Sequence, residues 1–384
     1  MCVGPIARLK HWGPITALGI IKVVTGMTVH CGTILWPPNT GQGLLLTASF
    51  LILSGLTLYN FLSAVFHGPG HLPLKWEPKD ESVKQFLQFC SVCKGFKAPR
   101  SHHCQKCGRC IIKMDHHCPW INNCVGWGNQ AHFTYFLMFA VIGCMQATCI
   151  LTCSLYKALY YNWYRYYTPE APRIYFSATG LITCVTALGL AIGIVVAVGM
   201  LLFLQVRGIL RNRTGIEDWI LDKAIRRRVN SKEKFTYPYN LGWWRNTKQV
   251  LNFSGSPIGN GVHWEVVDGC DQYTLTKEQL LQKAEKRKRT KLYHIIRAAS
   301  GAWVPICQGF RVFLTLPCSD EPRIKLAVGD QVMVTRWNKH WLFGELVRKD
   351  IREGETAPRI RGWFPRRCAV QTVEEDSDMS RKKK

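Results

Sequence analysis

The sequence predicts a multi-pass α-helical membrane protein with four transmembrane helices, a cysteine-rich metal-binding domain between the second and third helices, and a small β domain near the C-terminus. Three observations support this prediction. Apolar side chains gather in four long runs of the 384 residues, and each run can cross a hydrocarbon core that takes about 20 residues. Seven cysteines and four histidines lie between Cys90 and Cys124. Short β-type runs separated by turn residues occupy the last third.

The four apolar runs cover residues 13–36, 44–66, 132–155 and 176–206. The second and fourth runs are almost free of charge. The first contains Lys22, and a lysine at the centre of a span costs on the order of 2.5–3.5 kcal/mol. Trp12 and Trp36 nevertheless bracket this run, as interfacial aromatic residues do. The cysteines inside the runs are expected to be small apolar packing residues: Cys31, Cys144, Cys149, Cys153 and Cys184.

Basic residues predict the orientation of the spans. The link of residues 37–43 carries none, whereas the loop of residues 67–130 is rich in lysine and arginine, so this loop is expected in the cytosol. Basic residues before the first run and after the fourth place both termini on the same side. The second outer link, residues 156–175, holds only Lys157, Arg165 and Arg173. The first apolar run has no small-residue cleavage site, so no signal peptide is expected.

The cysteine-rich segment has the residue types and spacing of tetrahedral zinc sites, with pairs at Cys-x2-Cys spacing next to histidines. Two closed sites need eight ligands. The segment supplies eight candidates: Cys90, Cys93, His103, Cys104, Cys107, Cys110, His117 and Cys124. Cys118 is then left over, as are His102, His116 and Asp115. Because cytosolic thiols stay reduced, this cluster indicates metal binding or catalysis rather than disulfides.

The run Asp115-His116-His117-Cys118 predicts an activated thiol. An adjacent imidazole, His116, can take the proton of the Cys118 thiol. Asp115 can hold that imidazole in one tautomer and stabilise its charged form. The alternative is a structural zinc module in which Cys118 is an incidental extra cysteine.

The formal net charge of +25 permits two kinds of partner, nucleic acid and anionic lipid. The cysteine-rich segment lies about 20 residues from one span and almost touches the next, so it is expected at the membrane surface. We therefore expect attraction to lipid headgroups and no nucleic acid.

Residues 90–133 resemble the cysteine-rich domain of the DHHC protein S-acyltransferases, the palmitoyltransferases. Weaker likenesses extend over most of the chain. Gly68-Pro69-Gly70 stands where that family has Asp-Pro-Gly, and residues 214–217 stand where it has Thr-Thr-x-Glu. Residues 239–246 resemble the family's C-terminal motif. The first two of these motifs each depart from the family pattern at one position. The resemblance implies accessory contacts for Thr214, Glu217 and Asn246.

The resemblance implies roles for individual residues. One zinc ion would be held by Cys90, Cys93, His103 and Cys110, and a second by Cys104, Cys107, His117 and Cys124. Cys118 would be the acylated nucleophile, with His116 and Asp115 as its activating pair. The substrates would be a long-chain acyl-CoA and membrane-associated proteins with cytosolic cysteines, used in a ping-pong reaction. The acyl tail would occupy a cavity between the spans, and the depth of that cavity would select chain length.

Residues 298–373 resemble an SH3 domain, with predicted strands at residues 323–326, 329–334, 340–346 and 361–365. The complete predicted fold is therefore four transmembrane helices, a two-zinc domain and an SH3-like β-barrel. Trp341 and Pro365 match positions of the groove that binds proline-rich peptides. Cys368 stands where a groove tyrosine is common, so a docking module without ligand binding is an alternative. Cys307, Cys318 and Cys368 are expected to be packing residues.

The predicted organisation has six parts: residues 1–66 with the first two spans, 67–131 with the zinc domain, 132–206 with the last two spans, 207–297 as a juxtamembrane region, 298–373 as the SH3-like domain and 374–384 as a charged tail. The basic run of residues 283–291 is expected on a solvated helix face. The dibasic end and the likeness to an SH3-bearing member of the family predict the endoplasmic reticulum membrane. A zinc-stabilised membrane scaffold that recruits partners without catalysis is the second functional hypothesis.

Overall fold

The computed structural model describes residues 4–231, 233–252, 254–303, 308–319, 321–347 and 360–372. The predictions for Cys307 and for the tail of residues 374–384 lie outside these residues. The chain forms two compact units, Met1–Glu278 and Gln279–Lys384, and each is described by itself.

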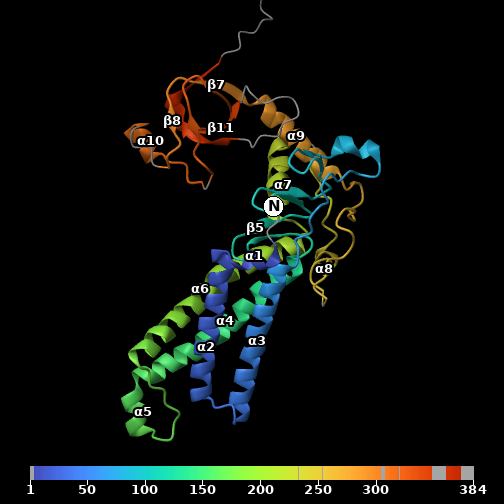
Figure 1. Ribbon diagram of the computed structural model, residues 1–384. Coiled ribbons are helices and arrows are strands. Elements are labelled where there is room, and N and C mark those ends of the chain that lie inside the picture. The colour runs from blue at the N-terminus through green and yellow to red at the C-terminus, as the bar shows by residue number, and fades with distance from the viewer. Residues whose placement is uncertain are drawn as a thin grey trace, which may run out of the picture. The chain divides into compact units, whose positions relative to one another are not determined.

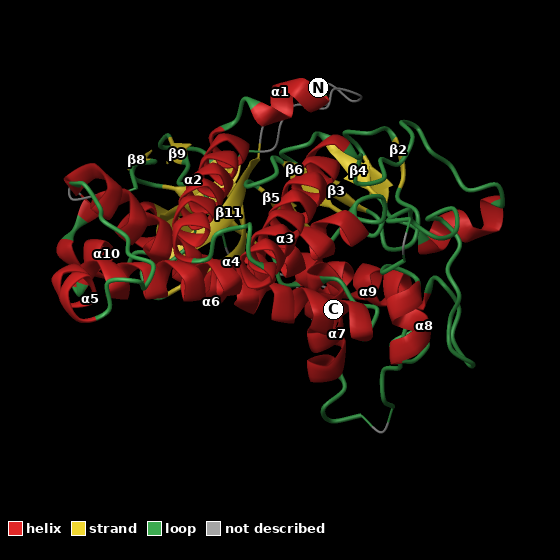
Figure 2. Ribbon diagram, turned by 90° about the horizontal axis from the view of Figure 1, so that it is seen from below, coloured by secondary structure: helices red, strands yellow, loops and turns green. Residues whose placement is uncertain are grey.

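Four long apolar helices form the first part of unit one and confirm the predicted spans. They are α2 (Trp12–Leu35), α3 (Gly41–Phe66), α4 (Gln130–Leu159) and α6 (Ala178–Leu210), and each is long and apolar enough to cross a membrane. Thr40 and Ser177 cap α3 and α6 by accepting backbone N–H bonds, as N-cap hydroxyls do. The helices run side by side (Figure 1), and α4 packs against the other three. Figure 2 shows α2 and α3 next to each other in the view from below.

Two short helices flank these spans. Helix α1 (Pro5–Leu9) precedes α2, and α5 (Tyr161–Tyr167) lies in the outer link between α4 and α6. The sequence predicted neither helix. Five of the seven residues of α5 are aromatic, and Trp163, Tyr166 and Tyr167 are exposed, which suits the interface between lipid and water.

The loop between α3 and α4 contains little regular structure. It holds a 3₁₀ helix, η1 (Glu81–Phe86), followed by three antiparallel hairpins. Their strands are β1 (Phe89–Cys90) with β2 (Gly95–Phe96), β3 (His102–Cys104) with β4 (Arg109–Ile111), and β5 (His116–Cys118) with β6 (Asn123–Val125). Strands of two or three residues cannot form a stable sheet alone. The three hairpins therefore need further contacts to keep their shape.

Three helices follow α6: α7 (Gly215–Arg227), α8 (Trp243–Lys248) and α9 (Thr274–Lys288). The Glu278 carboxylate joins α9 to α7 through Arg227 and Arg228, at 2.6 and 2.7 Å. The basic run of residues 283–291 begins on α9, where Lys283 is exposed, as predicted. The helix ends at Lys288, however, and Lys291 already belongs to a strand.

Unit two is built on a five-stranded antiparallel sheet with the order β12-β11-β10-β7-β13. The strands are β7 (Lys291–Ile295), β10 (Gln331–Asn338), β11 (Trp341–Val347), β12 (Arg361–Pro365) and β13 (Ala369–Gln371). A separate pair, β8 (Ala299–Ser300) and β9 (Lys325–Leu326), covers one side, with α10 (Phe310–Leu314) and η3 (Arg366–Cys368) beside it. Val332, Leu342 and Phe364 lie in the core of the unit.

The predicted β-barrel is not observed among the described residues. The edge strands β12 and β13 do not pair with each other, so the sheet stays open. Strand β7 also lies before the first residue of the predicted SH3-like range, and it pairs with both β10 and β13 inside the sheet. Each of the four predicted strands overlaps an observed one, so the local pattern was correct, whereas the predicted closure into a barrel was wrong.

Candidate functional site

The hairpin β5–β6 positions the Asp115-His116-His117-Cys118 run. Successive side chains of a strand point to opposite faces, so His116 and Cys118 share one face and His117 takes the other. The register pairs His117 with Cys124, which brings two candidate metal ligands together. The sequence forms this hairpin because Asn122, in a left-handed conformation at φ 46°, can turn the chain before β6.

Asp115, His116 and Cys118 lie in contact, as predicted. The Nδ1 atom of His116 lies 3.2 Å from Asp115 Oδ2, and the Cys118 thiol is within hydrogen-bonding reach of the same ring. Burial opposes the charged form of the imidazole, but the bonds to Asp115 and Cys118 outweigh it and raise the pKa of His116 to about 9. This arrangement favours the imidazolium form of His116.

Cys118 forms part of the wall of a cavity of about 410 Å³ between the long helices. The thiol itself is 5% exposed. The cavity is apolar, and small residues of α4 and α6 make room in it, including Gly143, Gly189 and Gly193. Its volume lies within the range of ligand pockets. A long hydrocarbon chain can therefore enter the bundle with its reactive end beside Cys118.

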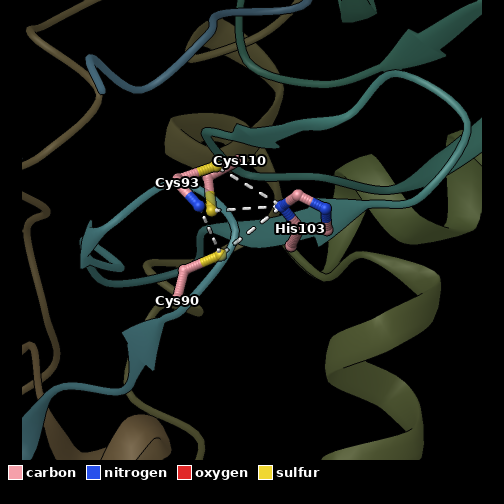
Figure 3. A group of neighbouring side chains, drawn as sticks. All are labelled: Cys90, Cys93, His103 and Cys110. Atoms are coloured by element: carbon pink, nitrogen blue, oxygen red, sulfur yellow. Dashed lines mark hydrogen bonds between the residues drawn. The ribbon is translucent and has the colours of Figure 1, made fainter. Parts of the chain in front are cut away.

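Two groups of cysteine and histidine side chains in this domain could each hold a metal ion, because their ligand atoms lie within 4.8 Å of one another. The first group is Cys90, Cys93, His103 and Cys110, and the second is Cys104, Cys107, His117 and Cys124. In Figure 3 the three sulfur atoms of the first group lie on one side of the His103 ring and face the same ring nitrogen. These are the two sets that the family resemblance implied. Because each set takes ligands from separate hairpins, the groups join all three.

The geometry of both groups fits Zn²⁺. The Nδ1 atom of His103 lies 3.5 Å from the sulfur atoms of Cys90 and Cys93, and His117 Nδ1 lies 3.5 Å from Cys107 Sγ. Zinc bonds of about 2.3 Å to sulfur and 2.0–2.1 Å to nitrogen, in a tetrahedron, place such atoms about 3.6 Å apart. The amide of Cys93 also donates to Cys90 Sγ, and that of Cys107 donates to Cys104 Sγ, which favours thiolate ligands.

The accessory residues Thr214 and Glu217 form a capping box at the start of α7. The Thr214 hydroxyl accepts the amide of Glu217, and the Glu217 carboxylate accepts the amide of Thr214. The helix start that results presents the N–H of Gly215 to Asp115 Oδ1 at 2.7 Å. The start of α7, 100 residues away in the sequence, thus fixes the Asp115 carboxylate, which in turn contacts His116.

Arg100 is the functional residue that sequence reasoning missed. Its guanidinium donates to both oxygens of Glu217, at 2.6 and 2.8 Å, and both side chains are fully buried. Burial opposes ionisation of Glu217, but Arg100 outweighs this effect and lowers the pKa of the carboxyl. Arg100 also bonds Asn212. In the sequence it was only one of nine basic residues in a cytosolic loop, and no spacing pattern connects it to Glu217.

Asn246 fixes the end of α6, as the C-terminal motif led us to expect. This asparagine is fully buried. Its amide donates to the carbonyl of Leu210, the last residue of α6, at 2.8 Å, and its oxygen accepts the N–H of Leu241 at 3.0 Å. These bonds satisfy a carbonyl that a helix end leaves open.

The predicted peptide groove of unit two is not open. Trp341 is 1% exposed, and its indole donates to the carbonyl of Val312 in α10 at 3.1 Å. Pro365 is buried. Cys368 is fully buried and its thiol donates to Gln308 at 3.2 Å, which agrees with a packing role, whereas Cys318 is exposed.

Comparisons with known proteins agree with this site. The pattern of the DHHC palmitoyltransferases matches residues 83–222. Palmitoyltransferase ZDHHC6 of Danio rerio is 43% identical over 390 residues, covering 98% of this chain and 94% of the relative. Palmitoyltransferase ZDHHC6 of Homo sapiens is 45% identical over 382 residues, covering 94% and 91%. Probable protein S-acyltransferase 16 of Arabidopsis thaliana is 32% identical over 223 residues, covering 56% and 74%.

Proposed function

This chain belongs to the DHHC palmitoyltransferase family, and on that premise we propose that Cys118 is the thiol that carries the acyl group from acyl-CoA to protein substrates. The chain is thus a multi-pass membrane palmitoyltransferase. One observation supports the assignment of Cys118 above the others. It is the one cysteine of residues 90–124 outside the two candidate metal groups, and it faces both His116 and the apolar cavity.

The proposed reaction has two transfers. His116, with Nδ1–H donated to Asp115, takes the Cys118 proton on its other ring nitrogen. The thiolate attacks the thioester carbonyl of acyl-CoA, a bond forms between Cys118 Sγ and the acyl carbon, and the bond to the CoA sulfur breaks. The departing CoA thiolate receives the proton from His116. A substrate cysteine then attacks the acyl-enzyme in the same way and leaves Cys118 as a thiol again.

The cavity would determine where the transfer takes place and which acyl chains are preferred. Each methylene that leaves water contributes about 0.8 kcal/mol, so a palmitoyl chain in the cavity brings a large binding energy. The CoA nucleotide stays in water at the cytosolic face. The thioester therefore comes to the boundary where Cys118 lies, and substrate cysteines must reach the same boundary, which favours membrane-associated proteins.

Both candidate metal groups are proposed to hold structural Zn²⁺. All four positions of each group come from protein side chains, and such closed sites supply folding energy rather than an open catalytic position. The three hairpins have little other means of holding Asp115, His116 and Cys118 in place. Each zinc ion would thus keep the site residues in position without taking part in the transfer reaction.

We also propose roles for the remaining parts of the predicted organisation. Residues 67–131 would be the cytosolic zinc domain, residues 207–297 would brace it through Arg100 and Glu217, and unit two would be an SH3-like docking module. The burial of Trp341 supports docking without proline-peptide binding. Residence in the endoplasmic reticulum is proposed on the resemblance to the SH3-bearing member of the family.

Intact mass of the purified protein after incubation with palmitoyl-CoA tests the proposal. The wild-type chain should gain one acyl group that hydroxylamine removes, and Cys118→Ser should gain none while keeping its zinc. Cys153→Ser, a change of an exposed cysteine on α4, is the matched control and should behave as wild type. If Cys118→Ser loses zinc in proportion to activity, Cys118 is a metal ligand and the zinc-stabilised scaffold becomes the better hypothesis.

A further inference from the structure

A second cavity, of about 210 Å³, lies between the cysteine-rich domain, the start of α4 and the segment that follows α8. It is separate from the acyl cavity, and the two share no lining residue. The polar and aromatic residues of its wall include Lys113, Trp127, Gln130, His263 and Trp264. The wall also contains one carboxylate, Glu265, which is paired with Arg245 at 2.9 Å. None of them takes part in the transfer reaction.

Lys113 places a positive charge in this cavity. The residue is 4% exposed, and no carboxylate or hydrogen-bond acceptor contacts its ammonium group among the described residues. Glu217 and Asp115 both favour the charged form of Lys113, but Glu217 is bound bidentately by Arg100 and Asp115 by Gly215 and His116. Burial, assisted by Arg100, lowers the pKa of Lys113 to about 7. A buried ammonium without an anion is unfavourable, and an anion in the cavity would stabilise the charged form of Lys113.

Two further polar groups line the same wall. The indole N–H of Trp264 is buried and has no hydrogen-bond partner, although few buried donors are left unpaired in folded proteins. The Trp264 ring lies between Arg100 and Lys113, at 4.7 and 5.8 Å from its centroid, which fixes its orientation. Gln130 is 4% exposed and is the second of these residues in the cavity wall.

The start of α4 adds to this field. Gln130 and Ala131 are the first two residues of this 30-residue helix, and its first turn contains no acidic residue. The side chain of the N-cap residue Asn129 makes no capping bond and instead binds the carbonyls of Ala64 and Cys124. The first turn of α4 therefore borders the cavity and has no acidic side chain to offset the positive end of the helix dipole.

We propose that this cavity binds a phosphate group, held by the Lys113 ammonium, the Trp264 indole N–H, the Gln130 amide and the start of α4. Phosphate suits the site because its several oxygens can accept from donors that converge from three segments, and ammonium groups bind it as a point charge. Three sources share this chemistry: free inorganic phosphate, the phosphates of CoA, and a phospholipid headgroup. The inference does not require Cys118 to be the nucleophile.

Isothermal titration of the full-length chain in a phosphate-free maltoside detergent tests the site, with Cys118→Ser as the background so that no acyl chemistry intervenes. The probes are inorganic phosphate, CoA and dihexanoyl phosphatidic acid. At least one should bind, and Lys113→Met should raise its Kd about tenfold or more, as loss of a charge-assisted bond does. The probe whose Kd rises in Lys113→Met shows which of the three sources supplies the phosphate group. Lys79→Met, which removes an exposed lysine of the same domain, should leave the Kd unchanged.

Zinc content and melting temperature establish that each variant is folded. Trp264→Phe, which keeps the ring and removes the N–H, should weaken the same probe by a few-fold and provides the test if Lys113→Met does not fold. The proposal is overturned if no probe binds the parent protein, or if folded Lys113→Met binds every probe as the parent does. Because no transfer is measured, this failure is distinct from a failure of the Cys118 assignment.

Discussion

The backbone N–H of Gly215 donates a 2.7 Å hydrogen bond to Asp115 Oδ1, while the other carboxylate oxygen of Asp115 contacts His116 Nδ1. One carboxylate thus connects the start of α7 to the proposed base. Since a carboxylate that orients an imidazole must itself be held, the start of α7 fixes Asp115 beside His116.

Replacing Gly215 by proline removes only this donor and should slow autoacylation about tenfold or more, in line with the loss of an outer bond to an orienting group. Gly215 is the first residue of α7, a position where proline is favoured, and Thr214 before it is extended, so the helix should persist. Gly215→Ala keeps the N–H and places its Cβ 3.6 Å from Asp115 Oδ1, an ordinary contact. Rapid-quench acylation rates should separate the two variants. Equal rates would remove Gly215 from the site.

The two adjacent histidines should differ in what they lose. His117→Ala should lose about one zinc per chain and unfold the domain more readily, because structural zinc contributes on the order of 10 kcal/mol or more in small modules. His116→Ala should keep both metals and slow acylation, with partial recovery at high pH as hydroxide replaces the missing base. Metal analysis beside acylation rates is the measurement. The assignment is wrong if both variants lose the same amount of metal.

A single methyl group on Gly13 should disturb the catalytic loop. An added Cβ would overlap the carbonyl oxygen of Pro119, the residue after Cys118, and neither backbone can move freely. Gly13→Ala should therefore lower autoacylation about tenfold to hundredfold, because displacements near 1 Å have effects of that size. Gly19→Ala lies on the same helix with no atom near the added methyl and should keep full activity. Intact-mass time courses would reveal the difference, and equal activity would mean that the loop can shift without consequence.

Filling the acyl cavity should shorten the preferred chain. Gly193 lines the cavity, so Gly193→Leu should reduce acylation by palmitoyl-CoA and favour shorter donors such as myristoyl-CoA. Gly199→Leu adds the same bulk to the same helix at a position outside the cavity wall and serves as control. Competition between the two donors, read by mass, reports the ratio. An unchanged ratio in Gly193→Leu would place the acyl chain elsewhere.

Local features of the sequence were sufficient for the spans and for the candidate chemistry. A span is recognised by its own residues because lipid requires a continuous apolar segment, and all four were found. The eight candidate ligands and the spare Cys118 followed from counting, because tetrahedral zinc needs four donors per site. Four strands of unit two, β9 to β12, were also visible as local runs of β-forming residues, whereas β7, β8 and β13 were not predicted.

Tertiary structure alone decided how these parts meet. The bond of Arg100 to Glu217, the contact of Gly215 with Asp115 and the cavity beside Cys118 each join segments whose separation in the chain carries no periodic signal. Whether the β sheet closes into a barrel, and whether Trp341 is buried against α10, also depends on contacts between residues far apart in the sequence. Hydropathy shows which segments can lie in lipid, and ligand spacing shows which segments can bind a metal. Packing between segments instead depends on shapes that arise only when the chain has folded.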